Sequence, residues 1–111
     1  MGQYHQVYNK TKKESLHAHK LELGLKLWEQ VGFAGSTADI LFALLSNSNG
    51  RGGGDLDENE VIGRWAGDEI VVQGDYAEEG DPGYIPEAQL AEYTDISKLV
   101  LPLQAELRRY E

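Results

Sequence analysis

The stretch that decides the fold is GSTADILFALLSN, residues 35–47. Ser36 and Asp39 have the spacing of a capping box at a helix N-terminus, and Thr37 is an alternative cap. The residues that follow, 40–45, are all apolar, so a helix formed by them is apolar on every side. Such a helix is buried on every side in a globular protein. We therefore predict a central core helix here.

The residues before this helix predict a β-hairpin. Residues 3–8 are rich in β-forming side chains, and residues 14–19 alternate between apolar and polar. The polar segment NKTKK, residues 9–13, separates them as a turn would. Residues 20–30 are ambiguous and predict a loop or short strand that leads into one turn of helix.

Two registers are open for this hairpin. If Tyr8 pairs with Ser15, Val7 meets Leu16 and the aliphatic side chains share one face. We favour this register because burying both side chains is worth a few kcal/mol. If Tyr8 pairs with Glu14 instead, all three histidines cluster. These are His5, His17 and His19.

The residues after the central helix predict a second hairpin and helices. Residues 60–65 and 69–76 read as its strands, with the turn at residues 66–68. Residues 77–83 read as a surface loop. A short helix is expected from Pro86, because proline suits the first helical turn.

The last helix is expected over residues 96–111, with Thr94 or Asp95 as its cap and Pro102 as a kink or break. The chain is therefore predicted to form one α+β domain, residues 1–111. In it, an antiparallel sheet of two β-hairpins packs on a buried central helix, and C-terminal helices cover an edge.

Charge is unevenly distributed along the sequence, and the formal net charge is −9. Residues 1–26 carry five lysines against two glutamates, whereas residues 52–95 carry thirteen acids against Arg64 alone. No broad phosphate-neutralising surface exists, so we expect no duplex nucleic acid as a partner. The acidic stretch reads either as a solvated surface or as a site for a cation or a partner.

Cysteine is absent from the sequence, which excludes disulfides, zinc–thiolate sites and thiol nucleophiles. This composition suits a cytoplasmic protein. The first ten residues lack the apolar core of a secretory signal. No apolar run approaches the ~18 residues of a membrane span, so we expect no membrane partner.

Residues 46–60, SNSNGRGGGDLDENE, form a glycine-rich loop. It matches neither a Walker A loop nor a GxGxxG turn. Successive amides in such a loop can converge on an anion, and Arg51 can clamp a phosphate or carboxylate. A mobile surface loop is the alternative, although glycine loses the most conformational freedom on folding.

The acids that follow suggest a divalent-ion site. Asp55, Asp57 and Asn59 fall at the first, third and fifth positions of an EF-hand loop. Glu60 stands where that loop needs glycine and Ala66 where it needs glutamate, so a true EF-hand is not expected. A looser site for a divalent metal remains a hypothesis, and no other cofactor is identified.

His17 and His19 lie on one face of the predicted strand and can chelate a transition metal if a carboxylate or His5 completes the shell. The alternative is a pair of ordinary surface histidines. Trp65 also has two interpretations. It is either a core residue beside a turn or a stacking platform for a base or sugar ring, with Tyr76 or Tyr84 nearby.

Four segments together resemble a family of small, largely uncharacterised proteins of bacteria, archaea and their phages. The segments are MGQYHQVYNKTKKE, HAHKLELGLKLWE, SNGRGGGDL and GRWAGDEIVVQGDYA, which span roughly residues 1–77. The middle residue of the His-x-His segment is usually proline in that family, whereas it is Ala18 here. The resemblance implies no activity, but it implies that the shared residues form one recurring constellation and suits a phage or mobile-element origin.

Three hypotheses for function follow. The first is a non-catalytic binding or regulatory protein that holds a small anionic, nucleotide-like ligand at the glycine-rich loop. The second is a protein-interaction or structural module that uses the acidic 52–95 surface. The third is a metal-assisted hydrolase built on His17 and His19. A homo-oligomer is expected because the core is small. The expected ligand-binding residues are Lys20, Asn49, Gly50, Arg51, Gly52, Gly53, Gly54, Asp55, Arg64, Trp65 and Asp68.

Overall fold

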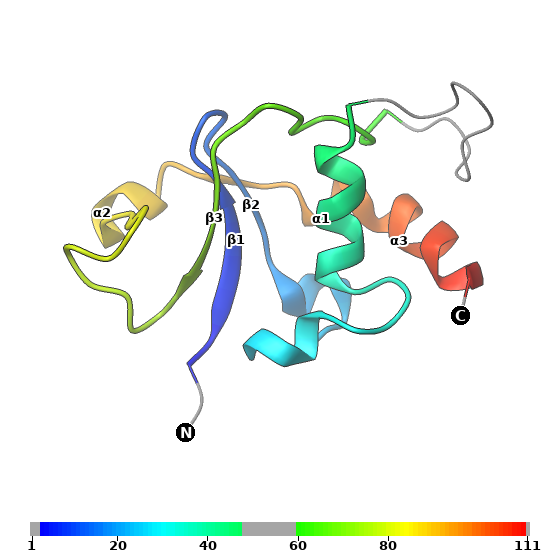
Figure 1. The fold of residues 1–111 in the computed structure, drawn as a ribbon, viewed down its shortest axis with the longest axis horizontal. Coiled ribbons are helices and arrows are strands. Elements are labelled where there is room, and N and C mark those ends of the chain that lie inside the picture. Colours follow the sequence, from blue (N-terminus) through cyan, green and yellow to red (C-terminus); the bar gives the residue numbers. More distant parts are fainter. Residues whose placement is uncertain (1–2, 48–59, 111) are drawn as a thin grey trace.

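The computed structural model describes residues 3–47 and 60–110. Its fold is α+β, with a sheet between helices (Figure 1). The strands are β1 (His5–Asn9), β2 (Glu14–Leu16), β3 (Ile70–Gly74) and β4 (Thr94–Asp95). The α-helices are α1 (Thr37–Leu45), α2 (Glu87–Leu90) and α3 (Leu101–Leu107). The 3₁₀ helices are η1 (Ala18–Leu21), η2 (Leu27–Gln30), η3 (Ser97–Val100) and η4 (Arg108–Tyr110).

The four strands form one mixed sheet in the order β3-β1-β2-β4. β1 pairs antiparallel with β2 in the favoured register, with Val7 opposite Leu16 and Tyr8 opposite Ser15. The expectation of a purely antiparallel sheet was wrong, because β4 pairs parallel with β2. Figure 1 shows α1 and α3 on one side of the sheet and α2 on the other.

Helix α1 begins where the sequence indicated. Ser36 is its N-cap, and its hydroxyl accepts a hydrogen bond from the Asp39 N–H. The Asp39 carboxylate accepts from the N–H of Gly35 instead of that of the cap residue. The first of these bonds satisfies a donor that a helix N-terminus leaves unpaired, and the second fixes the backbone just before the cap.

The prediction that α1 is buried on every side was wrong. Ile40 and Leu44 are fully buried in the core, but Phe42 is 81% exposed. The outward stripe of the helix is also apolar and includes Ala38, Leu41, Phe42 and Leu45, which follow the three- and four-residue spacing of one helical face. The helix therefore has one apolar face in the core and a second that neighbouring elements only partly cover.

The second predicted hairpin is absent from the described structure, because residues 60–67 form turns instead of a strand. The N–H groups of Gly63 and Trp65 donate to the carbonyls of Ala43 and Leu44 at the C-terminal end of α1. Gly63 has φ +85°, and a Cβ there would lie 2.8 Å from the Ser46 carbonyl oxygen. Capping α1 therefore takes the backbone groups that a hairpin strand would need.

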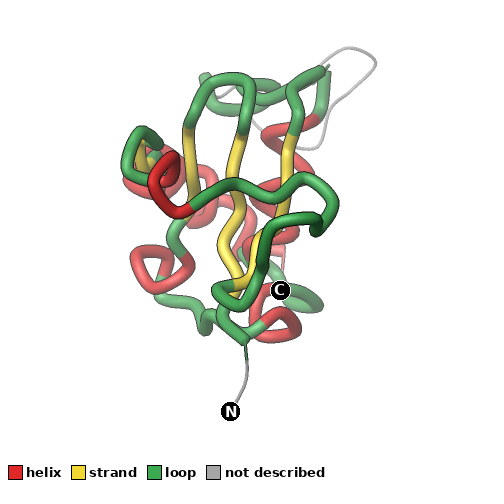
Figure 2. Tube along the Cα trace, turned by 90° about the vertical axis from the view of Figure 1, so that its left-hand side faces the viewer, coloured by secondary structure: helices red, strands yellow, loops and turns green. Residues whose placement is uncertain are grey.

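β3 pairs with β1 over its whole length, from His5 opposite Gly74 to Asn9 opposite Ile70. The segment that follows β3 returns across the face of the sheet opposite α1 (Figure 2). The Gln73 side chain fixes this segment by bonding both the N–H and the C=O of Ile85. On the same side, the rings of Tyr8 and Tyr93 pack edge to face, with their centroids 5.6 Å apart.

The C-terminal helix is divided, as Pro102 suggested. η3 precedes α3, and Pro102 lies in the first turn of α3, where its missing N–H is tolerated. The Asp95 carboxylate accepts from the N–H of Ser97 at the start of η3. On the described part of the chain, no helix is long and apolar enough to cross a membrane.

Candidate functional site

Glu14, Arg64 and Trp65 form a polar cluster between β2 and the turn that caps α1, in which Glu14 and Trp65 are buried and Arg64 is partly exposed. One carboxylate oxygen of Glu14 accepts from Arg64 Nε at 3.1 Å and from Trp65 Nε1 at 2.7 Å. The other accepts from an Arg64 terminal nitrogen at 2.6 Å. Alternation along β2 places Glu14 on the same face as Leu16, which is the core side.

The charges of this cluster stabilise one another. The Arg64 guanidinium holds the pKa of the Glu14 carboxyl below its ordinary value; burial opposes this shift, and the Trp65 N–H reinforces it. The bond with Glu14 in turn raises the pKa of Arg64. A carboxylate that is charge-paired and fully hydrogen-bonded is a structural anchor. It is a poor proton acceptor for catalysis.

Trp65 is a core residue, as the simpler of its two interpretations stated. Its side chain is fully buried, so no ring face is exposed for a ligand to stack on. The prediction that Trp65 is a stacking platform was therefore wrong. Trp65 packs in the core that includes Leu16 and Leu44. Its one polar atom is satisfied by Glu14.

The other described members of the expected ligand site lie in separate ion pairs. Lys20 contacts Asp95 from η1, Asp68 contacts Lys12 and Asn9 at the hairpin turn, and Arg64 contacts Glu14. Lys10 and Lys13 also pair with acids of the same chain, Glu69 and Glu92. The basic N-terminal hairpin thus meets the acidic residues of its own chain.

The glycine-rich part of the expected site lies outside the described residues. This applies to Asn49, Gly50, Arg51, Gly52, Gly53, Gly54 and Asp55, and to the divalent-ion ligands Asp57 and Asn59. The described residues place Arg64 and Trp65 together, but each of these side chains bonds to Glu14.

The two histidines of the predicted metal site do not share a strand face. β2 ends at Leu16, so His17 precedes η1 and His19 lies within it, which corrects the strand prediction. Their ring centroids are 5.8 Å apart. Among residues 3–47 and 60–110, no group of three or more His, Cys, Asp or Glu side chains is arranged to hold a metal ion.

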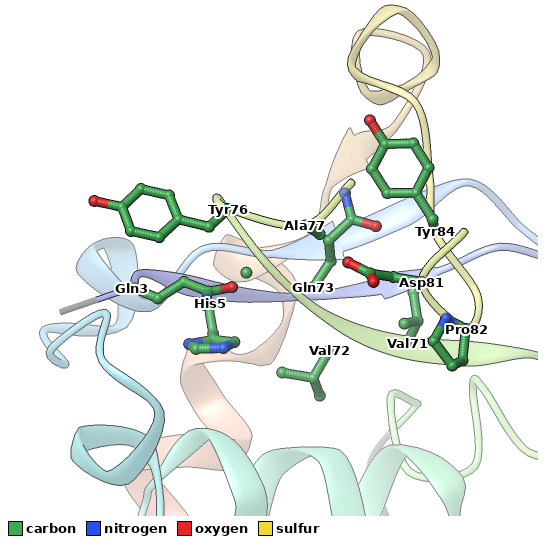
Figure 3. Close-up of a pocket in the computed structure, with 11 residues that line it drawn as sticks. Gln3, His5, Val71, Val72, Gln73, Tyr76, Ala77, Asp81, Pro82 and Tyr84 are labelled. Carbon is green, nitrogen blue, oxygen red and sulfur yellow. The ribbon is translucent and has the colours of Figure 1, made fainter. Parts of the chain in front are cut away.

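A polar pocket of about 250 Å³ opens beside the C-terminal half of β3 (Figure 3). Its walls include Tyr76 and Tyr84, the aromatic residues considered for stacking. The Gln73 amide at its centre is occupied by the backbone of Ile85. The pocket is therefore organised around a contact that holds the 75–85 segment in place.

An apolar groove of about 180 Å³ lies on the opposite side, between β3 and α1. We call it the α1–β3 groove. Its walls are Val7, Leu27, Gln30, Val31, Thr37, Ala38, Leu41 and Val72. Val72 is 44% exposed and points to the α1 side of the sheet in Figure 3. Leu27 is 42% exposed. Apolar side chains thus surround a hollow that the described chain leaves unfilled.

Two side chains beside this groove are more exposed still. Phe42 is one turn along α1 from Ala38, and Trp28, 77% exposed, follows Leu27 in the chain. The sequence did not reveal this surface, because residues 40–45 are apolar throughout and were expected to be buried. A signal was present, however, since a nine-residue helix beside a small sheet offers few neighbours for two apolar faces.

Comparison with known proteins gives no relative. No protein-family model, no curated protein and no solved structure matches the chain significantly.

Proposed function

We propose that this protein is a non-catalytic interaction module that binds another protein through the α1–β3 groove and the exposed side chains beside it. The observation that carries the proposal is the exposure of Phe42 and Trp28 next to an unfilled apolar hollow. Exposed apolar side chains gathered near an apolar groove are typical of binding sites in proteins. Aromatic side chains are also enriched among the residues that dominate interface energies.

The charged residues support a binding role over a catalytic one. Glu14 and Arg64 are paired with each other, and Asp68 and Asp95 are each paired with a lysine. General acid–base chemistry requires a titratable group that can reach a substrate proton. The ion pairs of these residues instead connect the first hairpin and η1 to residues 64, 68 and 95 later in the chain. The hypothesis of an interaction module used the acidic 52–95 surface, and of its described acids Asp75, Glu78, Glu79 and Asp81 are exposed.

The size of the site favours a protein over a small molecule. The α1–β3 groove has about 180 Å³, which is below the 300–1,000 Å³ typical of ligand pockets. Outside the hollow, Phe42 is next to the groove residue Leu41 in α1 and is 81% exposed. A partner that spans the groove and the neighbouring aromatic residues removes more apolar surface from water than a compound that fills only the groove.

Quantitative affinity capture from the native cells tests this proposal. Wild-type protein is compared with the Leu27→Ser/Phe42→Ser double variant. Loss of at least tenfold of the retained partner is expected, because both substitutions remove apolar contact while leaving the buried core intact.

The matched control is Leu99→Ser, which changes a side chain of similar exposure (47%) on η3. This variant should retain the partner at the wild-type level. Equal recovery with wild type and the double variant would contradict the proposed function.

A further inference from the structure

We propose that the partner binds as an added β-strand along β3, with an apolar side chain in the α1–β3 groove and Lys or Arg beside the acids that follow β3. This inference rests on the proposed function and specifies the chemistry of the partner. Strand addition to a free sheet edge, with alternate side chains entering a neighbouring groove, is an established mode of peptide recognition.

β3 is a border strand of the sheet, and the pairing with β1 shows which of its backbone groups face outward. Asp75 N–H donates to Tyr4 C=O, and Lys10 N–H donates to Glu69 C=O. Hydrogen-bonded pairs alternate along an antiparallel ladder, so Val71 and Gln73 bond to β1 between these two positions. The N–H and C=O groups of Ile70 and Val72 therefore point to the outer edge.

No described residue hydrogen-bonds to these outward groups of Ile70 and Val72. An incoming strand would pair with both residues. Side chains of directly opposed residues share a face of the sheet. The residue opposite Val72 would therefore place its side chain on the α1 side, where Val72 itself lines the groove.

Thr37 supplies a second observation at the same place. It lines the groove, its residue is 4% exposed, and its hydroxyl oxygen is buried without a hydrogen-bond partner among the described residues. Buried hydroxyls are normally bonded. The described residues cover this oxygen, so it marks an unsatisfied polar group within the wall of the groove and is not itself exposed to a bound segment.

The acidic residues that follow β3 indicate that the bound segment has a basic residue at one end. From Trp65 to Ser97 the sequence has no lysine or arginine. Asp75, Glu78, Glu79 and Asp81 follow β3, and all four residues are exposed. A basic residue at that end of the added strand meets several carboxylates, which favours encounter and orientation.

The same acids argue against a second copy of this chain as the occupant. If two β3 strands paired antiparallel about Val72, Asp75 of each would lie opposite Glu69 of the other. Like charges directly opposite one another destabilise a strand pair. The occupant is therefore a different, basic-ended segment.

Two bead-bound heptapeptide libraries test the proposal. Both alternate threonine with valine, isoleucine, leucine or phenylalanine; one ends in Lys-Arg and the other in Glu-Glu. The basic-ended library should retain at least tenfold more fluorescently labelled protein. Equal retention by both libraries, or retention by neither, overturns the proposal.

The best peptide is then N-methylated at successive positions and measured by fluorescence anisotropy. Methylation of the amides that face β3 should weaken binding at least tenfold, and methylation of the intervening amides should weaken it less than threefold. If methylation weakens binding equally at every position, or at none, strand addition is excluded. This readout needs no variant of the protein.

Val72→Pro removes the outward N–H without removing a hydrogen bond to β1. It should abolish peptide binding, whereas Val72→Thr, which keeps that N–H, should bind within fivefold of wild type. A partner that depends on Leu27 and Phe42 but still binds Val72→Pro would leave the proposed function intact and overturn the strand mode. Dimerisation through β3 in sedimentation would also overturn it.

Discussion

The carboxylate of Glu14 lies 2.7 Å from the indole nitrogen of Trp65, across 51 positions of sequence. The same carboxylate binds Arg64 with both oxygens. This cluster joins the first hairpin to the turn that caps α1. Removing the Glu14 carboxylate is destabilising chiefly through Trp65, whose indole N–H is fully buried and would lose its acceptor, whereas the Arg64 side chain is 35% exposed and stays in contact with water.

Replacing Glu14 with alanine should lower the free energy of unfolding by about 2–3 kcal/mol, because it leaves the buried Trp65 N–H without an acceptor and removes the pair with the partly exposed Arg64. Glu14→Gln keeps an acceptor for Trp65 and should cost less. Urea denaturation measures both. The control is Glu22→Gln, since Glu22 is highly exposed and 3.9 Å from Arg108. It should change stability by less than about 0.5 kcal/mol. If Glu14→Ala behaves like the control, the anchoring role is wrong.

The free energy of unfolding should decrease at acidic pH because Glu14 becomes protonated. Arg64, with help from Trp65, holds the pKa of Glu14 below its ordinary value of 4.5. A carboxyl with a depressed pKa in the folded state contributes stability above its unfolded pKa. That stability is lost as the pH falls through the folded pKa. Between pH 7 and pH 3, wild type should therefore lose more unfolding free energy than Glu14→Gln. Parallel curves for the two proteins would refute this assignment. Lys12, with Asn9, also lowers the pKa of Asp68, and this contribution is common to both proteins.

Placing aspartate on one or the other apolar face of α1 shows which face lies in the core. Leu44→Asp should unfold the protein, because it buries an unpaired charge at a fully buried site. Phe42→Asp should leave the melting temperature nearly unchanged, because Phe42 is largely exposed. Circular dichroism during heating distinguishes these outcomes. A folded Leu44→Asp variant would show that α1 does not occupy the core.

Gly63 and Gly67 provide a matched test of the turn that replaces the second hairpin. Both have positive φ, +85° and +81°, but only Gly63 faces a close neighbour, the Ser46 carbonyl. Gly67→Ala should cost about 1–2 kcal/mol for the left-handed backbone alone. Gly63→Ala should cost at least about 1 kcal/mol more, because the new methyl group overpacks against fixed backbone. Equal losses in urea denaturation would contradict the described path of residues 63–65.

The sequence predicted the elements whose signals are local. Ser36 and Asp39 marked the start of α1, and burial of Val7 with Leu16 identified the register of β1 and β2. It failed where a tertiary contact decides the outcome. Gly63 and Trp65 bond to the end of α1, which no propensity encodes, and residues 60–65 therefore form turns instead of a strand.

The candidate site illustrates the same limit. The residue types around Lys20, Arg64 and Asp68 suggested a ligand, but their charges are paired with acids and lysines distant in sequence. The exposure of Phe42 depends on how much of α1 the sheet covers, and a run of apolar residues does not specify this.

Amide hydrogen exchange along β3, followed residue by residue by NMR, tests the central claim most directly. In the free protein, the Ile70 and Val72 amides should exchange at least tenfold faster than those of Val71 and Gln73, because only the latter pair bonds to β1. With the basic-ended peptide bound, the Val72 amide should become as protected as that of Gln73. A Val72 amide that is already protected in the free protein, or that remains unprotected with the peptide bound, would contradict the account.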